Sequence, residues 1–325
     1  MQFQFLRLSA RSSFILCYDL AMNRTYAILG TGALGGFYGA RLQRAGLEVH
    51  FLLNSDYDHV RQHGLICESI DGDFSLPRVN AYRNTRDMPR CDVVCITLKT
   101  TQNHLLPTLL PPVVKDDTLV IAMQNGLGNE DEVAAIVGAD RVAGGLCFLC
   151  SNKTAPGHIC HLDYGYVRFG NHNNGVTDRL RAVAADFQRA DITAECVEDL
   201  RAARWRKLVW NIPYNGLSVI LRATTAQLMR DAHTRTLVES LMREIAPCEP
   251  AITDEFIQKM LRDTDKMKPY KTSMRLDYEA HRPMEIEYIY GNPMRAAQQQ
   301  GMTVPRIEAL YRQLKFLDAA NTIRR

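Results

Sequence analysis

The first two thirds of the chain carry short apolar runs between polar or glycine-rich stretches, and the last third carries apolar residues at helical spacing. Short runs that are apolar throughout are typical of strands buried on both faces of a parallel sheet. We expect such strands at 25–29, 48–53, 92–98 and 118–123. Shorter runs predict further strands, antiparallel and closing the sheet, at 141–150, 157–162, 166–170 and 192–197. From Leu200 onward the pattern predicts helices and no strand.

This change of pattern and the length of 325 residues together predict two domains. We expect an α/β domain of the Rossmann type over residues 23–198 and an all-helical domain over residues 199–325. Residues 1–22 stand apart, because their apolar patch is broken and no clear cleavage site follows it. We interpret them as a poorly ordered extension or as an over-long translation start, with Met22 as the alternative first residue.

The most specific motif follows the first strand, where Gly30-Thr31-Gly32-Ala33-Leu34-Gly35 matches the pattern Gly-x-Gly-x-x-Gly. Gly30 allows a tight turn, Gly32 lets a pyrophosphate approach the backbone, and Gly35 lets the next helix pack closely. The N–H groups at the helix start then face the anion. A strand precedes the motif, and a helix and a second strand follow it, as a βαβ unit requires. The motif therefore predicts dinucleotide binding rather than a glycine-rich turn without a ligand.

Charge and composition argue against several other functions. The formal net charge is only +3, and no cluster of Lys or Arg stands out, so we expect neither a nucleic acid nor a membrane surface as partner. No apolar run approaches the roughly 20 residues of a membrane-spanning helix. The nine cysteines are scattered, which predicts reduced thiols and a cytoplasmic protein. Cys147 and Cys150, with His158, Cys160 and His161 nearby, lack the spacing of a zinc site, so we predict no metal.

The start of the helical part carries Lys207, Asn211 and Asn215 at intervals of four residues. On a helix these side chains lie on one face, with Ser218 close to the same stripe. Burying them without partners is costly, so the stripe faces either water or a polar ligand. Asparagine is a poor helix former, which favours a ligand site over a solvated surface. Pro213, inside the same helix, predicts a kink.

Taken together, these motifs show that the chain resembles the ketopantoate reductase (2-dehydropantoate 2-reductase) family from Thr25 to about Leu310. The segments that carry the resemblance are the glycine motif, Thr97-Leu98-Lys99, Gln124-Asn125-Gly126-Leu127-Gly128, Trp205-Arg206-Lys207-Leu208 with the two asparagines, Ser273-Met274, and Glu285-Ile286-Glu287-Tyr288-Ile289-Tyr290-Gly291. The resemblance implies a Rossmann-type domain followed by a helical domain like the C-terminal domain of 6-phosphogluconate dehydrogenase.

The activity implied by the resemblance is that of an oxidoreductase acting on CH–OH groups. It would reduce the ketone of 2-dehydropantoate to (R)-pantoate with NADPH, in pantothenate and coenzyme A biosynthesis. The lysine that matches Lys207 protonates the nascent alkoxide, and such an ammonium also stabilises the negative charge that hydride addition builds on oxygen. The residues that match Asn211 and Asn215 hold the substrate, and the one that matches Ser273 contacts its carboxylate.

Two further residues of the family serve both cofactor and active site. The asparagine that matches Asn125 sits between cofactor and substrate, and the glutamate that matches Glu285 serves catalysis and the cofactor. From the sequence alone, Glu285 fits equally well at the start of a helix, because it follows Pro283-Met284.

The chain departs from the family pattern after the second strand. Members that prefer NADP often carry an arginine there, whereas this chain has Asn54-Ser55, and Asp56 comes two positions later. We expect Asn54 to contact the cofactor and Lys99 to supply positive charge, and we keep NADP as the expected cofactor, with NAD as the alternative.

Two alternatives to this activity stay open at this stage. Thr225 and Tyr270 stand where some family members have asparagines, so another branched 2-oxo acid, such as 2-oxoisovalerate, is a second candidate substrate. A redox sensor that binds a dinucleotide without turnover is a third reading, which is disfavoured because it has no need of a proton donor. The expected partner is a small 2-oxo acid, and a homodimer is compatible with the sequence, which does not decide the oligomeric state.

Overall fold

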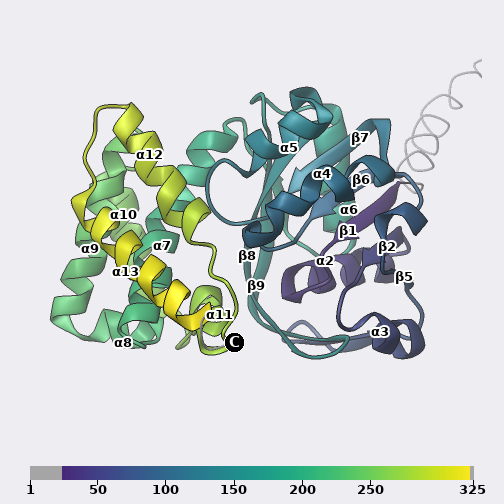
Figure 1. Cartoon of the computed structure of the whole chain (residues 1–325), viewed down its shortest axis with the longest axis horizontal. Coiled ribbons are helices and arrows are strands. Elements are labelled where there is room, and N and C mark those ends of the chain that lie inside the picture. Colours follow the sequence, from purple (N-terminus) through teal and green to yellow (C-terminus); the bar gives the residue numbers. More distant parts are fainter. Residues whose placement is uncertain (1–23, 323–325) are drawn as a thin grey trace, which may run out of the picture. The chain divides into compact units, whose positions relative to one another are not determined.

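The computed structural model of the protein describes residues 24–322, so the prediction for residues 1–22 lies outside the described residues (Figure 1). The contacts divide the described chain into two compact units. The first unit contains residues 24–98, 105–123 and 133–198, and the second contains residues 99–104, 124–132 and 199–322. The second unit therefore includes two short segments from the N-terminal half of the chain.

The first unit is built on one sheet, in which ten strands occur within the described residues. Their order is β4-β3-β9-β8-β7-β6-β1-β2-β5, and β10 pairs with β9. The strands are β1 (Thr25–Leu29), β2 (Glu48–Leu52), β3 (Leu65–Ser69), β4 (Phe74–Leu76), β5 (Asn80–Tyr82), β6 (Cys91–Ile96), β7 (Val114–Ala122), β8 (Val142–Ala155), β9 (His158–Asn171) and β10 (Ala194–Cys196). Since β1 pairs in parallel with β2 on one side and β6 on the other, the chain reverses its direction of winding at β1. Ligands of open α/β sheets bind beyond the carboxyl ends of the strands at such a point.

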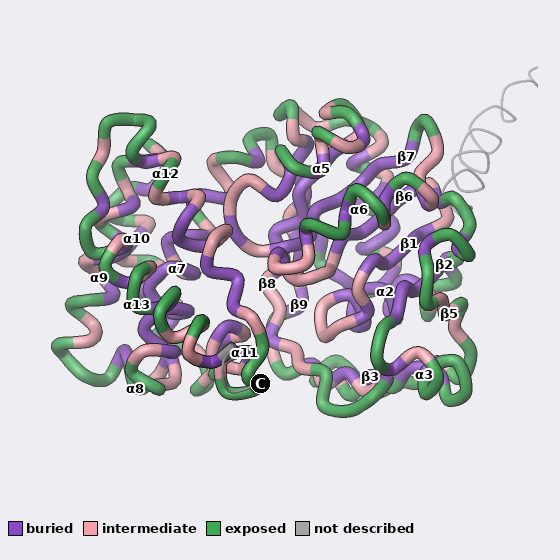
Figure 2. Tube along the Cα trace, viewed as in Figure 1, coloured by how far each residue is buried: buried purple, intermediate pink, exposed green. Residues whose placement is uncertain are grey.

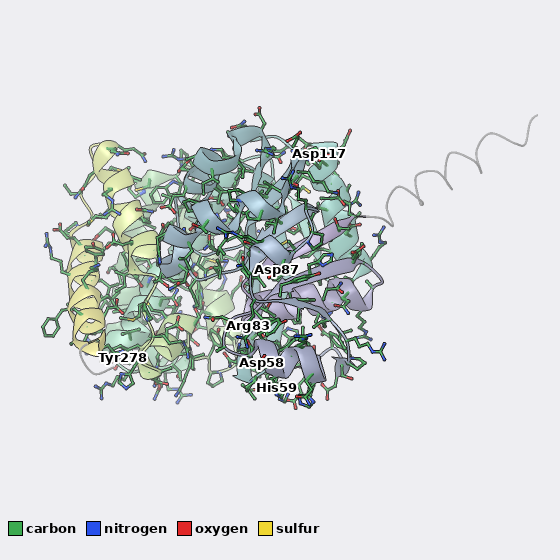
Figure 3. The ribbon with its side chains drawn as sticks, turned by 45° about the vertical axis from the view of Figure 1, so that its right-hand side comes forward. Asp58, His59, Arg83, Asp87, Asp117 and Tyr278 are labelled. Atoms are coloured by element: carbon green, nitrogen blue, oxygen red, sulfur yellow. The ribbon has the colours of Figure 1, made fainter. Side chains whose placement is uncertain are left out.

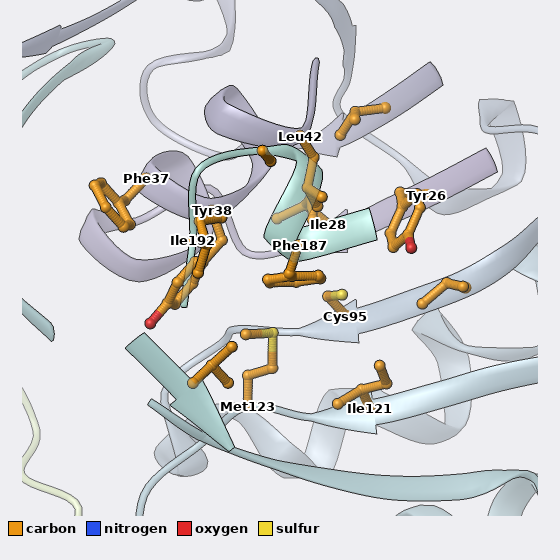
Figure 4. Packing of buried hydrophobic residues seen from close by; sticks show 14 of the residues in the cluster. Tyr26, Ile28, Phe37, Tyr38, Leu42, Cys95, Ile121, Met123, Phe187 and Ile192 are labelled. Atoms are coloured by element: carbon orange, nitrogen blue, oxygen red, sulfur yellow. The ribbon is translucent and has the colours of Figure 1, made fainter. Parts of the chain in front are cut away.

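Helices cover both faces of this sheet. They are α2 (Ala33–Arg44), α3 (Tyr57–His63), α4 (Leu106–Leu109), α5 (Asn129–Val137) and α6 (Asp178–Arg189), with short helical turns η1 (Thr85–Asp87), η3 (Pro111–Val113) and η4 (Ala139–Arg141). The turn η2 (Thr100–Leu105) belongs almost entirely to the second unit. Tyr26 and Ile28 of β1 belong to a core with α2 and α6, which Figure 4 shows around Phe187. Ala27 and Leu29 belong to a second core on the opposite face. The strand is therefore buried on both faces, as its apolar run predicts.

The strand predictions are confirmed for the central part of the sheet and wrong in two respects outside it. β8 and β9 are antiparallel, but β8 pairs with β7 in parallel, and β10 pairs with β9 in parallel. Residues 158–171 form one strand instead of two, because Gly165, with φ +124°, is accommodated as an extra residue at a register shift opposite Phe148 and Leu149. Strands β3, β4 and β5 and helix α6 were not predicted.

Buried thiols give the first unit a testable property. Cys67, Cys91 and Cys95 are at most 1% exposed. Burial raises the pKa of Cys67 and Cys91 from the usual 9.0 to about 11, and that of Cys95 still higher. We expect these thiols to resist Ellman's reagent at about pH 8 in the native protein and to react once guanidinium unfolds it. Rapid labelling of the native protein at these positions would contradict the prediction.

The same shifts fix the sign of a pH effect on stability. Because the folded state favours the neutral thiol, burial of Cys67 and Cys91 contributes fully to the stability of the folded protein below pH 9.0. This contribution is lost as the pH rises through about 11.

The described residues of the second unit form helices and connecting loops and no strand, as predicted. Its helices are α7 (Leu200–Ile220), α8 (Thr225–Arg230), α9 (Ala232–Ile245), α10 (Asp254–Lys266), α11 (Ser273–Glu279), α12 (Asn292–Gln299) and α13 (Pro305–Thr322), with the turn η5 (Ala246–Cys248) and the π-helix η6 (Glu287–Gly291). α7 is the most buried of these, with a core that includes Trp205, Leu208 and Ile212 (Figure 2). It runs unbroken through Pro213. None of the helices within residues 24–322 is long and apolar enough to cross a membrane.

Candidate functional site

The glycine motif forms the connection between β1 and α2 in the first unit. Gly30 has φ +105°, a conformation that side chains disfavour. A Cβ at Gly35 would lie 2.3 Å from the carbonyl oxygen of Gly30 and 2.4 Å from Oγ1 of Thr97, so helix and strand approach too closely for any larger residue. Both glycines thus have the local roles that the motif predicts.

This connection offers space and donors for an anion. A Cβ at Gly32 would meet nothing within 4 Å. Helix α2 begins at Ala33, followed by Leu34, and no side chain caps its N-terminus. The first N–H groups of a helix have no partner within the helix and attract anions. Thr31 donates both its N–H and its hydroxyl to the carbonyl oxygen of Leu52, at 3.2 and 2.9 Å. The motif is thereby tied to the end of β2, and the arrangement fits the pyrophosphate of a dinucleotide.

The carboxyl ends of β6 and β2 lie beside the glycine motif. Thr97, directly after β6, donates its hydroxyl to the carbonyl oxygen of Gly30 at 2.7 Å. Asn54 follows β2 and is exposed, and its carbonyl accepts the N–H of Tyr57 at 3.3 Å. Residues of the glycine motif and the ends of β2 and β6 therefore lie together at the carboxyl edge of the sheet.

In the second unit, α7 carries the predicted polar stripe. Asn211 and Asn215 are 6% and 4% exposed, while Lys207 is partly exposed. Neither asparagine has a hydrogen-bond partner for its side-chain amide among the described residues. Both amides are therefore left open to a polar ligand, which fits a binding site better than a structural role.

The stripe continues to the helix that carries Ser273. Ser218 is fully buried, and its hydroxyl lies 2.7 Å from the hydroxyl of Thr272. Thr272 caps the N-terminus of α11 by accepting the N–H of Arg275, and Ser273 is the first residue of that helix. α7 thereby fixes the start of α11, which links Ser273 to the face of Asn211 and Asn215.

Glu285 is 6% exposed and is held in place from two sides. The N–H of Thr100 donates to its Oε1 at 2.9 Å, and the ammonium of Lys99 lies 3.3 Å from its Oε2. Lys99 also donates to Oδ2 of Asp277 at 2.8 Å. The pKa of Lys99 is raised above its usual value. Burial alone would lower the pKa, but the negative charges of Glu285 and Asp277 outweigh that effect. Lys99 is thus a permanent cation shared by two carboxylates.

Glu285 also lies directly ahead of a helical segment, which agrees with the alternative interpretation of its position. The segment begins at Ile286 and contains the π-helix η6, and π-turns occur often at functional sites. Its carboxylate, however, binds Thr100 and Lys99.

The loop that carries Asn125 is anchored by the helices of the same unit. Arg204 of α7 donates to the carbonyl oxygen of Gln124 at 2.6 Å and to Oε1 of Glu130 at 2.9 Å. The N–H of Leu127 donates to the carbonyl oxygen of Tyr288 at 2.9 Å. Asn125 is therefore held between a contact to α7 and a contact to η6.

The predicted residues are divided between the two units. In the first unit these are Gly30, Thr31, Gly32, Ala33, Leu34, Gly35 and Asn54. In the second unit they are Lys99, Asn125, Lys207, Asn211, Asn215, Ser273 and Glu285. Sequence reasoning missed Asp277 and Arg204. Asp277 stands four residues after Ser273 on α11, a spacing that places both on one helix face and could have indicated it.

The comparisons with known proteins cover both units. The family model "Ketopantoate reductase PanE/ApbA" matches residues 26–174, and the model of its C-terminal part matches residues 199–318. A 2-dehydropantoate 2-reductase of Nostoc sp. is 58% identical over 92% of this chain and 96% of its own length. The structure of 2-dehydropantoate 2-reductase from Geobacter metallireducens is 40% identical, with a TM-score of 0.88 over 90% of this chain and 99% of that one. A ketopantoate reductase from Staphylococcus aureus, described as dimeric, shares the fold at 20% identity, with a TM-score of 0.77 over 91% of this chain and 99% of that one.

Proposed function

The chain belongs to the ketopantoate reductase family, and we propose that it reduces the ketone of 2-dehydropantoate to (R)-pantoate with NADPH. The observation that carries this proposal is the stripe on α7, where Lys207 is followed by two buried asparagines whose amides have no partner among the described residues. Such a stripe supplies a proton donor and two neutral hydrogen-bonding groups, which a hydroxylated 2-oxo acid needs. The reaction is a step in the biosynthesis of pantothenate and coenzyme A.

NADPH supplies the hydride that is added to C2 of the substrate, and it leaves as NADP⁺. The glycine motif and the N-terminus of α2 would hold its pyrophosphate, and Asn54 would contact its adenosine ribose. As negative charge develops on the ketone oxygen, Lys207 stabilises it and donates the proton that completes the alcohol.

The remaining residues position the substrate. Asn211 and Asn215 bind its polar groups through their amides, and Ser273 donates to its carboxylate. Glu285, whose position Lys99 and Thr100 fix, accepts a hydrogen bond from the substrate hydroxyl or from the cofactor. Asn125 contacts both cofactor and substrate from its anchored loop.

The test is an assay of the full chain with 2-dehydropantoate, in which the loss of NADPH absorbance is followed and NADH is run in parallel. We expect turnover with NADPH, and much slower turnover with 2-oxoisovalerate, which lacks the hydroxyl group. Faster reduction of 2-oxoisovalerate would replace the proposed substrate by another branched 2-oxo acid. Binding of NADPH without turnover of either acid would favour a redox sensor, which neither the relatives nor the site favour.

Assembly and location follow as separate proposals. We propose a homodimer, on the precedent of the S. aureus relative, and light scattering of the purified protein tests it. We also propose that the enzyme works in the cytoplasm, which the free thiols Cys67, Cys91, Cys95 and Cys248 support, because reducing compartments preserve them. Fractionation of cells that produce the protein tests the location.

A further inference from the structure

The 2′-phosphate of NADPH needs a positive charge near the end of β2, and the residues directly after this strand carry none. They are Asn54 and Ser55, followed by Asp56. Lys99, the cation first expected to help, is engaged by the carboxylates of Asp277 and Glu285. Another residue of the first unit must therefore supply the charge if the enzyme uses NADPH as proposed.

Asp56 is held in a way that removes its charge from this region. It is 5% exposed, and its Oδ2 accepts hydrogen bonds from the ammonium of Lys153 at 2.8 Å and from the N–H of Gly157 at 3.3 Å. Although Asp56 directly precedes α3, its carboxylate does not cap that helix. An acidic residue that selects NAD binds the ribose hydroxyls and repels a 2′-phosphate. Here the carboxylate is turned toward β8 and β9 and is neutralised by Lys153.

The strand that carries Lys153 also contacts the glycine motif. Ser151 of β8 lies with its Oγ 3.5 Å from the carbonyl oxygen of Ala33. Ser151 and Lys153 are two residues apart in a regular stretch of the strand, so both side chains lie on the same face. Strand β8 therefore contacts the glycine motif through Ser151 and the turn after β2 through Lys153. That turn is where the adenosine ribose of a bound dinucleotide lies.

We propose that Lys153 forms the 2′-phosphate subsite, with its ammonium bridging Asp56 and the phosphate. The ammonium has three donors, of which Asp56 takes one, and the side chain is 30% exposed. Charge-assisted hydrogen bonds of this kind are about twice as strong as neutral ones. The subsite rests on the proposed use of NADPH, and it explains how a chain without the usual arginine tolerates the phosphate.

Arg83 is another cation near this edge. It follows β5, which pairs with β2, but it forms an ion pair with Asp58 (Figure 3). Its guanidinium lies 4.7 Å from the ring centre of Tyr57. Lys153 and Arg83 are each paired with a carboxylate, but the strand that carries Lys153 also contacts the glycine motif through Ser151, whereas Arg83 is 59% exposed beside an exposed Asp58. We therefore assign the phosphate to Lys153 and make Arg83 one arm of the test.

The test compares binding of two fragments that differ in the 2′-phosphate. Calorimetric titration of the full chain with 2′,5′-ADP and with 5′-AMP measures the phosphate contribution without turnover. For Lys153→Met we expect the affinity for 2′,5′-ADP to fall about tenfold or more, and the affinity for 5′-AMP to change less than about twofold. Lys115→Met is the matched control, because Lys115 pairs with Asp92 at the amino ends of β7 and β6, so its loss should leave both affinities unchanged. Equal loss with both fragments would overturn the proposal.

A double variant separates direct contact from simple neutralisation of Asp56. If Lys153 binds the phosphate itself, adding Asp56→Asn to Lys153→Met leaves the affinity for 2′,5′-ADP low. Full recovery of this affinity in the double variant, or a larger loss in Arg83→Gln than in Lys153→Met, would refute the assignment. Since neither fragment reacts, these outcomes are independent of whether 2-dehydropantoate is the substrate.

Discussion

Replacing Lys207 with methionine will lower kcat/KM for 2-dehydropantoate by about 10²–10⁴-fold, the usual contribution of a positioned general acid. Methionine keeps most of the side-chain length and removes only the ammonium. The proton donor and the charge that stabilises the developing alkoxide are then lost together. Binding of NADPH, measured by its fluorescence, is expected to change little, because Lys207 is not among the assigned cofactor contacts.

The matched control is Lys271→Met in the same unit. Lys271 is about half exposed and pairs with Glu279, so its removal should leave kcat/KM unchanged. A Lys207→Met enzyme that keeps kcat and loses only affinity for the substrate would show that Lys207 binds the ground state and does not act as the acid.

Replacing Arg204 with methionine will destabilise the second unit by about 3–5 kcal/mol, the cost of leaving a buried charge without its partner. The Arg204 and Glu130 side chains are 2% and 7% exposed, and their ion pair joins α7 to the start of α5. Arg204 also donates to the carbonyl oxygen of Gln124, in the loop that carries Asn125. Both tryptophans of the chain, Trp205 and Trp210, lie on α7, so tryptophan fluorescence during urea unfolding reports on this unit. We expect a lower urea midpoint and, because the loop loses an anchor, a raised KM.

Two further variants make this prediction specific. Adding Glu130→Gln to Arg204→Met removes the orphaned carboxylate and should return much of the lost stability. Arg312→Met breaks an exposed pair with Glu308 on α13 and should leave the midpoint unchanged. If the double variant is as unstable as Arg204→Met alone, the loss comes from packing around Arg204 and not from the unpaired charge.

The features that the sequence alone determined are local. The apolar run of β1, the glycine motif and the start of α2 follow one another within 20 residues of chain, so periodicity and glycine spacing were enough to predict them. The stripe of Lys207, Asn211 and Asn215 was predictable for the same reason, because a helix repeats every 3.6 residues and places them on one face. Family resemblance then indicated Asn125, Ser273 and Glu285, whose roles stay predictions.

What only the tertiary structure decided depends on residues far apart in the chain. Lys99 meets Glu285 and Asp277, Arg204 meets Glu130, and Lys153 meets Asp56, each across 74 or more positions. No local period relates such residues, because the path of the chain through the sheet and the helices brings them together. The parallel pairing of β8 with β7 and of β10 with β9 was missed for the same reason. An apolar run predicts that a strand exists but not which strand lies beside it. The sequence therefore determined which chemical groups the protein carries, and the fold determined which of their charges are neutralised and which are left for a ligand.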